Sequence, residues 1–241
     1  MEETTKKIAE RMGCKYQAFE KGSDPKLVEK AYMAALENAK AGGYYPAIIC
    51  LESYAVEVLL EGALGGGYDR QQILDSCQDN GQEILKERYA SYTEYWEEGE
   101  INDFIGTETE GEVQREFIGY RSFRDGTLQE DTLLLEIPVK NPWEIIAYLP
   151  MGGWNECPSP EEMISICKYW YEKYEAVPAL FTSDVMEFYA PKGLNGVDSL
   201  EAAKEQYAFC TDRVDQGTST YKISELAAGL EQSVVWYFWW D

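Results

Sequence analysis

The chain has 241 residues, of which 45% are hydrophobic, so it can bury a sizeable core as one large domain or two small ones. Its 44 acidic and 21 basic residues give a net charge of −23, which argues against binding to nucleic acid or to an anionic membrane. The chain has no histidine, which excludes Ser-His-Asp and Cys-His catalysis and removes the commonest transition-metal ligand. We expect no metal and no cofactor.

The first half of the chain is predicted to alternate helices with short strands. Asp24 and Pro25 are typical of a helix start, and Gly42-Gly43 of a helix end. The run Tyr45–Leu51 is apolar and predicts a buried strand. The other predicted elements of this half are a helix over 2–12, a strand over 14–19, a helix over 53–62, and a helix over 69–96 broken near Asn80-Gly81.

An acidic segment follows in the middle of the chain. Residues 79–116 contain 12 acidic and 3 basic residues, and three glycines interrupt 97–112. This composition indicates an exposed connector over 99–111. We expect one compact domain over 1–241, with a helix-rich part over 1–98 and a second part over 112–241.

The second half is predicted to continue the alternation of strands and helices. Asp125-Gly126 indicates a hairpin, and Ser159-Pro160 indicates a capped helix start. The predicted elements are strands over 116–123 and 132–139, a short helix from 141, a helix from 159, strands over 177–182 and 185–190, and helices over 198–210 and 220–230. The pattern predicts an α/β fold, with α+β as the alternative, in which helices flank a mixed sheet.

Two features concern the arrangement of the strands. The strands that begin Tyr45-Pro46-Ala47 and Val177-Pro178-Ala179 resemble each other, which indicates either a degenerate helix–strand duplication or chance similarity. Five of the last six residues, 236–241, are aromatic. A loose terminus of this composition would aggregate, so we expect a buried terminal strand and a complete chain.

The C-terminal third resembles the bacterial family known as domain of unknown function 4253. The segments that carry the resemblance are 153–158, 168–176, 186–188, 205–212, 215–217 and 236–241. The resemblance implies an intracellular bacterial protein and implies no activity.

The cysteines and the absence of long apolar segments also indicate an intracellular protein. The six cysteines include no Cys-x-x-Cys pair, the chain begins without an apolar leader, and no apolar stretch is long enough to span a membrane. We therefore expect reduced thiols in a cytoplasmic protein.

The loop Met151–Pro158 is the first candidate site. Trp154 offers a flat apolar surface, Asn155 and Glu156 offer polar groups, and Cys157 is a candidate nucleophile. A following helix N-terminus would lower the pKa of the cysteine. The alternative is an ordinary connection in which Trp154 packs in the core and Asn155 caps backbone groups.

The second candidate lies near the C-terminus. Asp212, Asp215 and Gln216 carry oxygens that suit a hard cation, although their spacing differs from an EF-hand and also fits turn residues. Asp241 adds two carboxylates, which we expect to pair with a cation such as Arg213 or Lys168.

These observations favour a non-enzymatic acidic protein that binds a basic protein partner. Immunity proteins that neutralise basic toxins have this composition. The alternatives are a carboxylate- or Cys-dependent hydrolase or transferase, or a small-ligand sensor, centred on residues 151–158. The acidity also fits a role in solubility alone. The sequence leaves the partner and the oligomeric state open.

Overall fold

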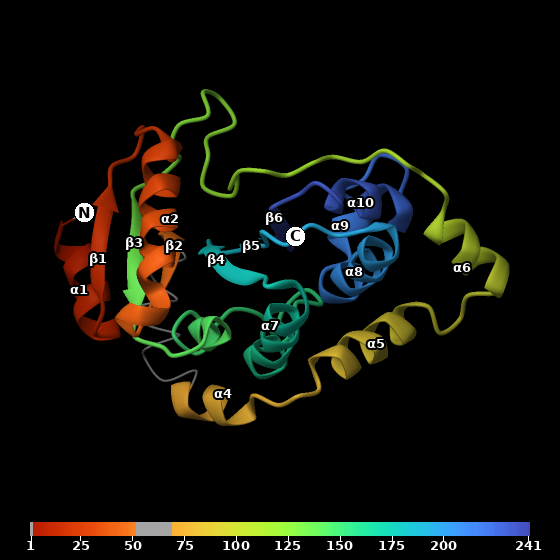
Figure 1. Ribbon diagram of the computed structural model, residues 1–241, viewed down its shortest axis with the longest axis horizontal. Coiled ribbons are helices and arrows are strands. Elements are labelled where there is room, and N and C mark those ends of the chain that lie inside the picture. Colours follow the sequence, from red (N-terminus) through yellow and green to blue (C-terminus); the bar gives the residue numbers. More distant parts are fainter. Residues whose placement is uncertain (1, 52–68) are drawn as a thin grey trace.

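A six-stranded mixed sheet with the strand order β1-β3-β2-β4-β5-β6 forms the centre of the computed structural model, which describes residues 2–51 and 69–241 (Figure 1). The strands are β1 (Lys15–Phe19), β2 (Tyr45–Cys50), β3 (Thr132–Ile137), β4 (Val177–Phe181), β5 (Val185–Tyr189) and β6 (Val235–Trp239). The helices are α1 (Glu2–Met12), α2 (Pro25–Gly42), α4 (Arg70–Ser76), α5 (Gly81–Tyr92), α6 (Glu98–Ile105), the 3-10 helix η2 (Pro142–Ala147), α7 (Pro160–Tyr174), α8 (Gly196–Phe209), α9 (Asp212–Asp215) and α10 (Ile223–Leu230). The predicted α/β fold with helices around a mixed sheet is confirmed.

The two similar strands are neighbours at the centre of the sheet. β2 and β4 run parallel with Ile48 opposite Leu180, whereas all other neighbouring strands are antiparallel. The helices that lead into them cover opposite faces, because Tyr32 of α2 and Trp170 of α7 belong to different buried clusters. A two-fold axis parallel to the strands would superimpose α2 and β2 on α7 and β4, because it keeps the strand direction and exchanges the two faces of the sheet. Their common origin stays a prediction.

The larger buried face carries an aromatic cluster built around Trp170 of α7. Its ring contacts Phe188 of β5, Phe209 of α8, and Trp236 and Phe238 of β6, with centroids 4.9–5.6 Å apart. The last strand therefore fills the core, as its aromatic composition predicted. In the described part of the chain, no helix has both the length and the apolar composition that a membrane crossing requires.

Several predicted boundaries need correction. The break in the helix predicted over 69–96 is confirmed, since α4 ends at Ser76 and α5 begins at Gly81. Residues 116–123 form no strand, and the predicted hairpin reduces to one bridge between Arg121 and Leu128. Phe117 and Tyr120 are instead buried under the second face of the sheet. The helix predicted over 53–62 lies outside the described residues.

The acidic connector contains a helix that its composition did not predict. Glu97 and Glu100 form a capping box, in which the Glu97 N–H donates to Glu100 Oε2 at 2.8 Å. The helix packs through Phe104, whose ring centroid lies 4.9 Å from that of Tyr207 on α8. Strands from both sides of this segment share one sheet.

Glu187 of β5 is a fully buried carboxylate that holds the 117–120 loop on the sheet. It accepts backbone N–H groups from Ile118 at 3.0 Å and Gly119 at 3.1 Å. Burial raises the pKa of Glu187 to about 8, although these two N–H donors oppose the shift. The folded protein therefore keeps a proton on Glu187 over a pH range in which the unfolded chain has lost it.

We expect the Glu187→Gln variant to lose part of the pH dependence of stability. In the wild type, the free energy of unfolding should fall as pH rises from about 4.5 to about 8, by up to about 1.4 kcal/mol per pH unit, because the folded state binds the extra proton. Glutamine cannot titrate, so the variant should lack this slope. Urea unfolding of both proteins at pH 5 and pH 8 measures the change in the free energy of unfolding with pH. An equal change in the wild type and the variant would contradict the raised pKa of Glu187.

Candidate functional site

Several residues that the sequence singled out lie together around the C-terminus. The Asn155 side-chain amide donates to the backbone carbonyl of Asp241. The Asp241 N–H lies 3.4 Å from Asp212 Oδ2, and the Trp154 ring contacts that of Trp240 with centroids 6.5 Å apart. The loop over 151–158 thus packs on the end of the chain.

This loop has an unusual backbone. Gly152 and Gly153 have φ of 107° and 78°, and the non-glycine residues Asn155 and Glu156 have φ of 42° and 62°. A side chain at Gly152 would collide with the carbonyl oxygen of Pro158, so only glycine fits there. Left-handed non-glycine residues cost free energy and persist only where surrounding contacts hold them.

Contacts from α5 and from Thr211, the residue that precedes α9, hold the loop in place. Arg88 of α5 donates to the backbone carbonyl of Glu156 and, at 2.8 Å through Nε, to the carbonyl of Ala208 on α8. Thr211 Oγ1 lies 3.4 Å from Glu156 Oε2. The polar groups of the loop are therefore used in contacts with the protein itself.

Cys157 does not have the properties of a nucleophile. Its side chain is buried, and this burial raises the pKa of the thiol well above its usual value. The expectation of a lowered pKa at this position is therefore wrong, because desolvation outweighs the effect of the nearby helix N-terminus. A thiol in this state is poorly ionised at neutral pH and reacts slowly.

The second candidate group belongs to a short helix. Asp212 and Asp215 are the first and last residues of α9, and Gln216 Nε2 donates to Asp212 Oδ1 at 2.7 Å. Burial, with help from the negative charges of Asp212 and Glu156, raises the pKa of Asp215. In the described residues, no three His, Cys, Asp or Glu side chains are arranged to hold a metal ion.

The cations expected to pair with Asp241 have other partners. Lys168 forms an ion pair with Asp79. Arg213 Nε donates to Gln206 Oε1 at 3.2 Å, and its guanidinium lies over the Phe238 ring, 5.7 Å from the centroid. Both cations therefore act within the fold.

A second region, which sequence reasoning treated only as a connector, has a surface of its own. Residues 106–116, here called the strap, run from α6 across α10 to the loop that begins at Phe117 (Figure 1). The Glu108 N–H donates to Ser224 Oγ at 3.0 Å, and the Gln114 N–H donates to Ser233 Oγ at 2.9 Å. Ser224 in the first turn of α10 and Ser233, three residues beyond its end, therefore fix the strap.

Between these two contacts, the strap crosses the α10 backbone at two glycines. A Cβ on Gly111 would overlap the Glu225 carbonyl oxygen and would lie 2.7 Å from the Gly229 nitrogen. A Cβ on Gly229 would overlap the Glu112 carbonyl oxygen. Glycine is required on both sides because the two backbones touch.

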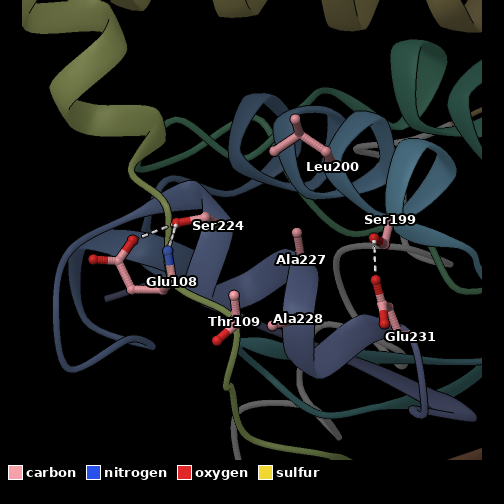
Figure 2. A pocket seen from close by; sticks show the side chains of 9 residues that line it. Glu108, Thr109, Ser199, Leu200, Ser224, Ala227, Ala228 and Glu231 are labelled. Carbon is pink, nitrogen blue, oxygen red and sulfur yellow. Dashed lines mark hydrogen bonds between the residues drawn. The ribbon is translucent and has the colours of Figure 1, made fainter.

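A pocket lies between the strap, α8 and α10 (Figure 2). Its volume is about 370 Å³. Glu108 with Ser224 and Glu231 with Ser199 stand at opposite sides, and Ala227 of α10 lies between them. The pocket, here called the central hollow, thus combines an apolar floor with a carboxylate at each side.

Two further hollows adjoin the strap and α6. One of about 530 Å³ is lined by Glu108, Glu110, Glu112 and Glu225. The other, of about 520 Å³ and here called the aromatic hollow, is lined by Trp96, Gly99, Glu100, Asp103, Phe104 and Lys222. Carboxylates therefore line all three concave surfaces.

Two carboxylates, Glu108 of the strap and Glu225 of α10, are held in the ionised state. Burial opposes ionisation of Glu225, but hydrogen bonds from Thr220 and Ser219 lower its pKa to about 2. The hydroxyl of Ser224 lowers the pKa of Glu108. Glu108 and Glu225 therefore carry negative charge at neutral pH.

The described architecture is that of an α/β protein with an acidic surface at one side of the sheet. Residues 133–241 match the family model described as Domain of unknown function (DUF4253), which identifies this part of the chain as such a domain. The resemblance of the C-terminal third is thereby confirmed. The comparisons with curated proteins and with solved structures found no match.

Most of the acidic surface lies outside the matched region. Glu108, Glu110 and Glu112 precede residue 133, whereas Glu231 and the whole of α10 lie within it. The sequence signal of this surface is the run of acidic residues over 97–112, which was interpreted as a connector. The hollows depend on contacts between distant segments, so the run alone did not predict them.

Proposed function

We propose that this protein is a non-enzymatic binding protein that presents the strap and α6 to a basic protein partner in the cytoplasm, in the manner of an immunity protein. The observation that carries the proposal is the charge of this surface. Residues 97–112 contain seven acidic and no basic residues, and they border three hollows lined by carboxylates. Such a surface attracts a cationic partner and speeds its association.

The acids of this surface are largely free of internal neutralisation. Asp103 pairs with Lys222 at 2.7 Å. Within the described ranges, Glu98, Glu110 and Glu112 form no ion pair and are exposed. Carboxylates that serve the fold would be paired or bonded internally, as Glu187 is, so these are available to a partner.

No observation favours a second function to the same degree. Cys157 is buried and its pKa is raised, which argues against the Cys-dependent alternative. The polar groups of the 151–158 loop contact the C-terminus, α5 and Thr211, the residue that precedes α9, which favours a structural role for that loop.

The experiment is a pull-down from the source lysate with tagged protein, at low and at high salt, and with two charge variants. The first variant carries Glu98→Gln, Glu110→Gln and Glu112→Gln. The matched control carries Glu83→Gln and Glu87→Gln of α5 together with Glu94→Gln, which are also exposed.

We expect the wild type and the control to recover one basic protein at low salt and to lose it at high salt. The first variant should recover at least about tenfold less, because several charge contacts are removed together. Equal recovery by both variants, or recovery independent of salt, would overturn the proposal.

A further inference from the structure

We propose that the aromatic hollow is a socket for an arginine side chain of the basic partner. The inference rests on the proposed function and deepens it, because it names the residue type that the surface selects. The carrying observation is a pair of aromatic rings at the wall of an open concavity, with carboxylates beside them.

The two rings of the socket are held by ring contacts. Trp96 and Phe104 contact edge to face, with centroids 5.1 Å apart and planes at 88°. Phe104 is fixed from behind by Tyr207 of α8. Both aromatic side chains are only half-buried, so part of their surface remains open to a ligand.

One position in the wall is kept open by the absence of a side chain. Gly99 lines the hollow, and a Cβ built on it would meet no atom within 4 Å. Gly99 is the second residue of α6, and most other residues favour a helix more than glycine does. Neither packing nor a left-handed conformation requires glycine at this position, and the absence of a side chain leaves the hollow accessible there.

The carboxylates of the hollow have different roles. Asp103 is neutralised by Lys222, which also ties α6 to the start of α10. Glu100 uses Oε2 in the capping box and is exposed, and among the described residues no cation pairs with it. Glu100 is therefore the carboxylate that remains for a ligand.

A guanidinium group fits this combination better than an ammonium group. Arginine is planar and weakly hydrated, stacks on aromatic faces, and donates parallel N–H groups to a carboxylate. The lysine ammonium is compact and strongly hydrated, so it gains less from an aromatic wall. The hollow thus distinguishes two residues that the charge of the strap alone attracts equally.

The test measures binding of a nona-arginine and a nona-lysine peptide by calorimetry at low and high salt. The Gly99→Leu variant fills the hollow, and leucine also favours the helix. Gly193→Leu is the matched control, because Gly193 also faces open space, in a different part of the chain. Thermal unfolding of both variants checks that the fold is kept.

We expect the wild type and Gly193→Leu to bind nona-arginine at least about fivefold more tightly than nona-lysine, as one partly exposed cation–π contact predicts. Gly99→Leu should lose this preference and retain its affinity for nona-lysine. Arginine binds acidic surfaces well in general, so the loss of preference in this variant is the decisive result.

The two proposals fail in different ways. Salt-sensitive binding of both peptides with an unchanged arginine preference in Gly99→Leu would overturn the socket and leave the acidic binding surface standing. Equal affinity of the wild type for the two peptides would also overturn the socket and leave the acidic binding surface standing. Absence of binding of either peptide at low salt would overturn the socket and the proposed function together.

Discussion

The Trp170→Ala variant is expected to lose about 3–5 kcal/mol of the free energy of unfolding, the range typical of removing a large aromatic side chain from a packed core. Trp170 is fully buried, and its ring contacts residues on β5, α8 and β6. The deletion would leave a cavity where α7 packs on the sheet. Chemical denaturation followed by circular dichroism measures the loss.

A second substitution separates packing from hydrogen bonding at the same position. Trp170 Nε1 donates to Glu205 Oε2 at 3.0 Å, and Glu205 is buried. Trp170→Phe keeps a ring but removes this donor, so we expect a loss of about 1–3 kcal/mol. Tyr169 and Lys173 still contact the other oxygen of Glu205, which limits the cost.

Trp143→Ala is the control for these variants, because Trp143 is only half-buried and, among the described residues, the only aromatic ring that it contacts is that of Tyr171. We expect it to lose clearly less stability than Trp170→Ala. Equal losses in the two alanine variants would show that the cluster around Trp170 is not the centre of the core.

The elements that sequence reasoning located correctly are those whose signal is local. Asp24 caps α2 by accepting the Lys26 N–H at 3.0 Å, and Ser159 begins α7 within a capping box. The buried strands β2 and β4 are continuous apolar runs, as central strands of a sheet are. Composition and caps were sufficient to locate these elements because their sequence signals lie within the elements themselves.

The errors occurred where distant contacts decide the structure. Residues 116–123 have strand-forming side chains, but Glu187 takes the N–H groups of Ile118 and Gly119 that a strand would use. The acidic composition of residues 98–105 predicted an exposed connector. The ring of Phe104 nevertheless packs against Tyr207, about a hundred residues further along the chain. Neither partner is visible in a local window of sequence.

The candidate site residues also divide into those with a local sequence signal and those that depend on distant contacts. Trp154, Asn155 and Glu156 stood out because residue types of this kind form sites, and the structure brings them to the C-terminus. The side-chain amide of Asn155 and the carboxylate of Glu156 are used there in internal contacts. The strap became a candidate surface only once its path across α10 was known, because that path creates the central hollow.

The Gly111→Val variant tests whether the path of the strap matters for both stability and binding. Its side chain would overlap the backbone of α10, which cannot move as a flexible side chain would. We expect the free energy of unfolding to fall by about 1–3 kcal/mol, as for overpacking elsewhere. The strap should separate from α10, and the bonds of Glu108 to Ser224 and of Gln114 to Ser233 should open.

Two measurements follow the strap itself. Amide hydrogen exchange at Glu108 and Gln114 should become faster, because both N–H groups lose their serine partners. Gly99→Ala is the control: its site is open, so it should keep the fold and leave the exchange of these amides unchanged. Wild-type exchange rates in Gly111→Val would contradict the close crossing.

The same variant connects the fold to the proposed function. Gly111→Val keeps every acidic residue, so a surface that attracts partners by net charge alone would bind nona-arginine as the wild type does. If fixed positions of Glu108, Glu110 and Glu112 beside the hollows matter, binding should weaken several-fold although the charge is unchanged. Unchanged affinity in a variant with a demonstrably open strap would show that the acidic surface needs no defined shape.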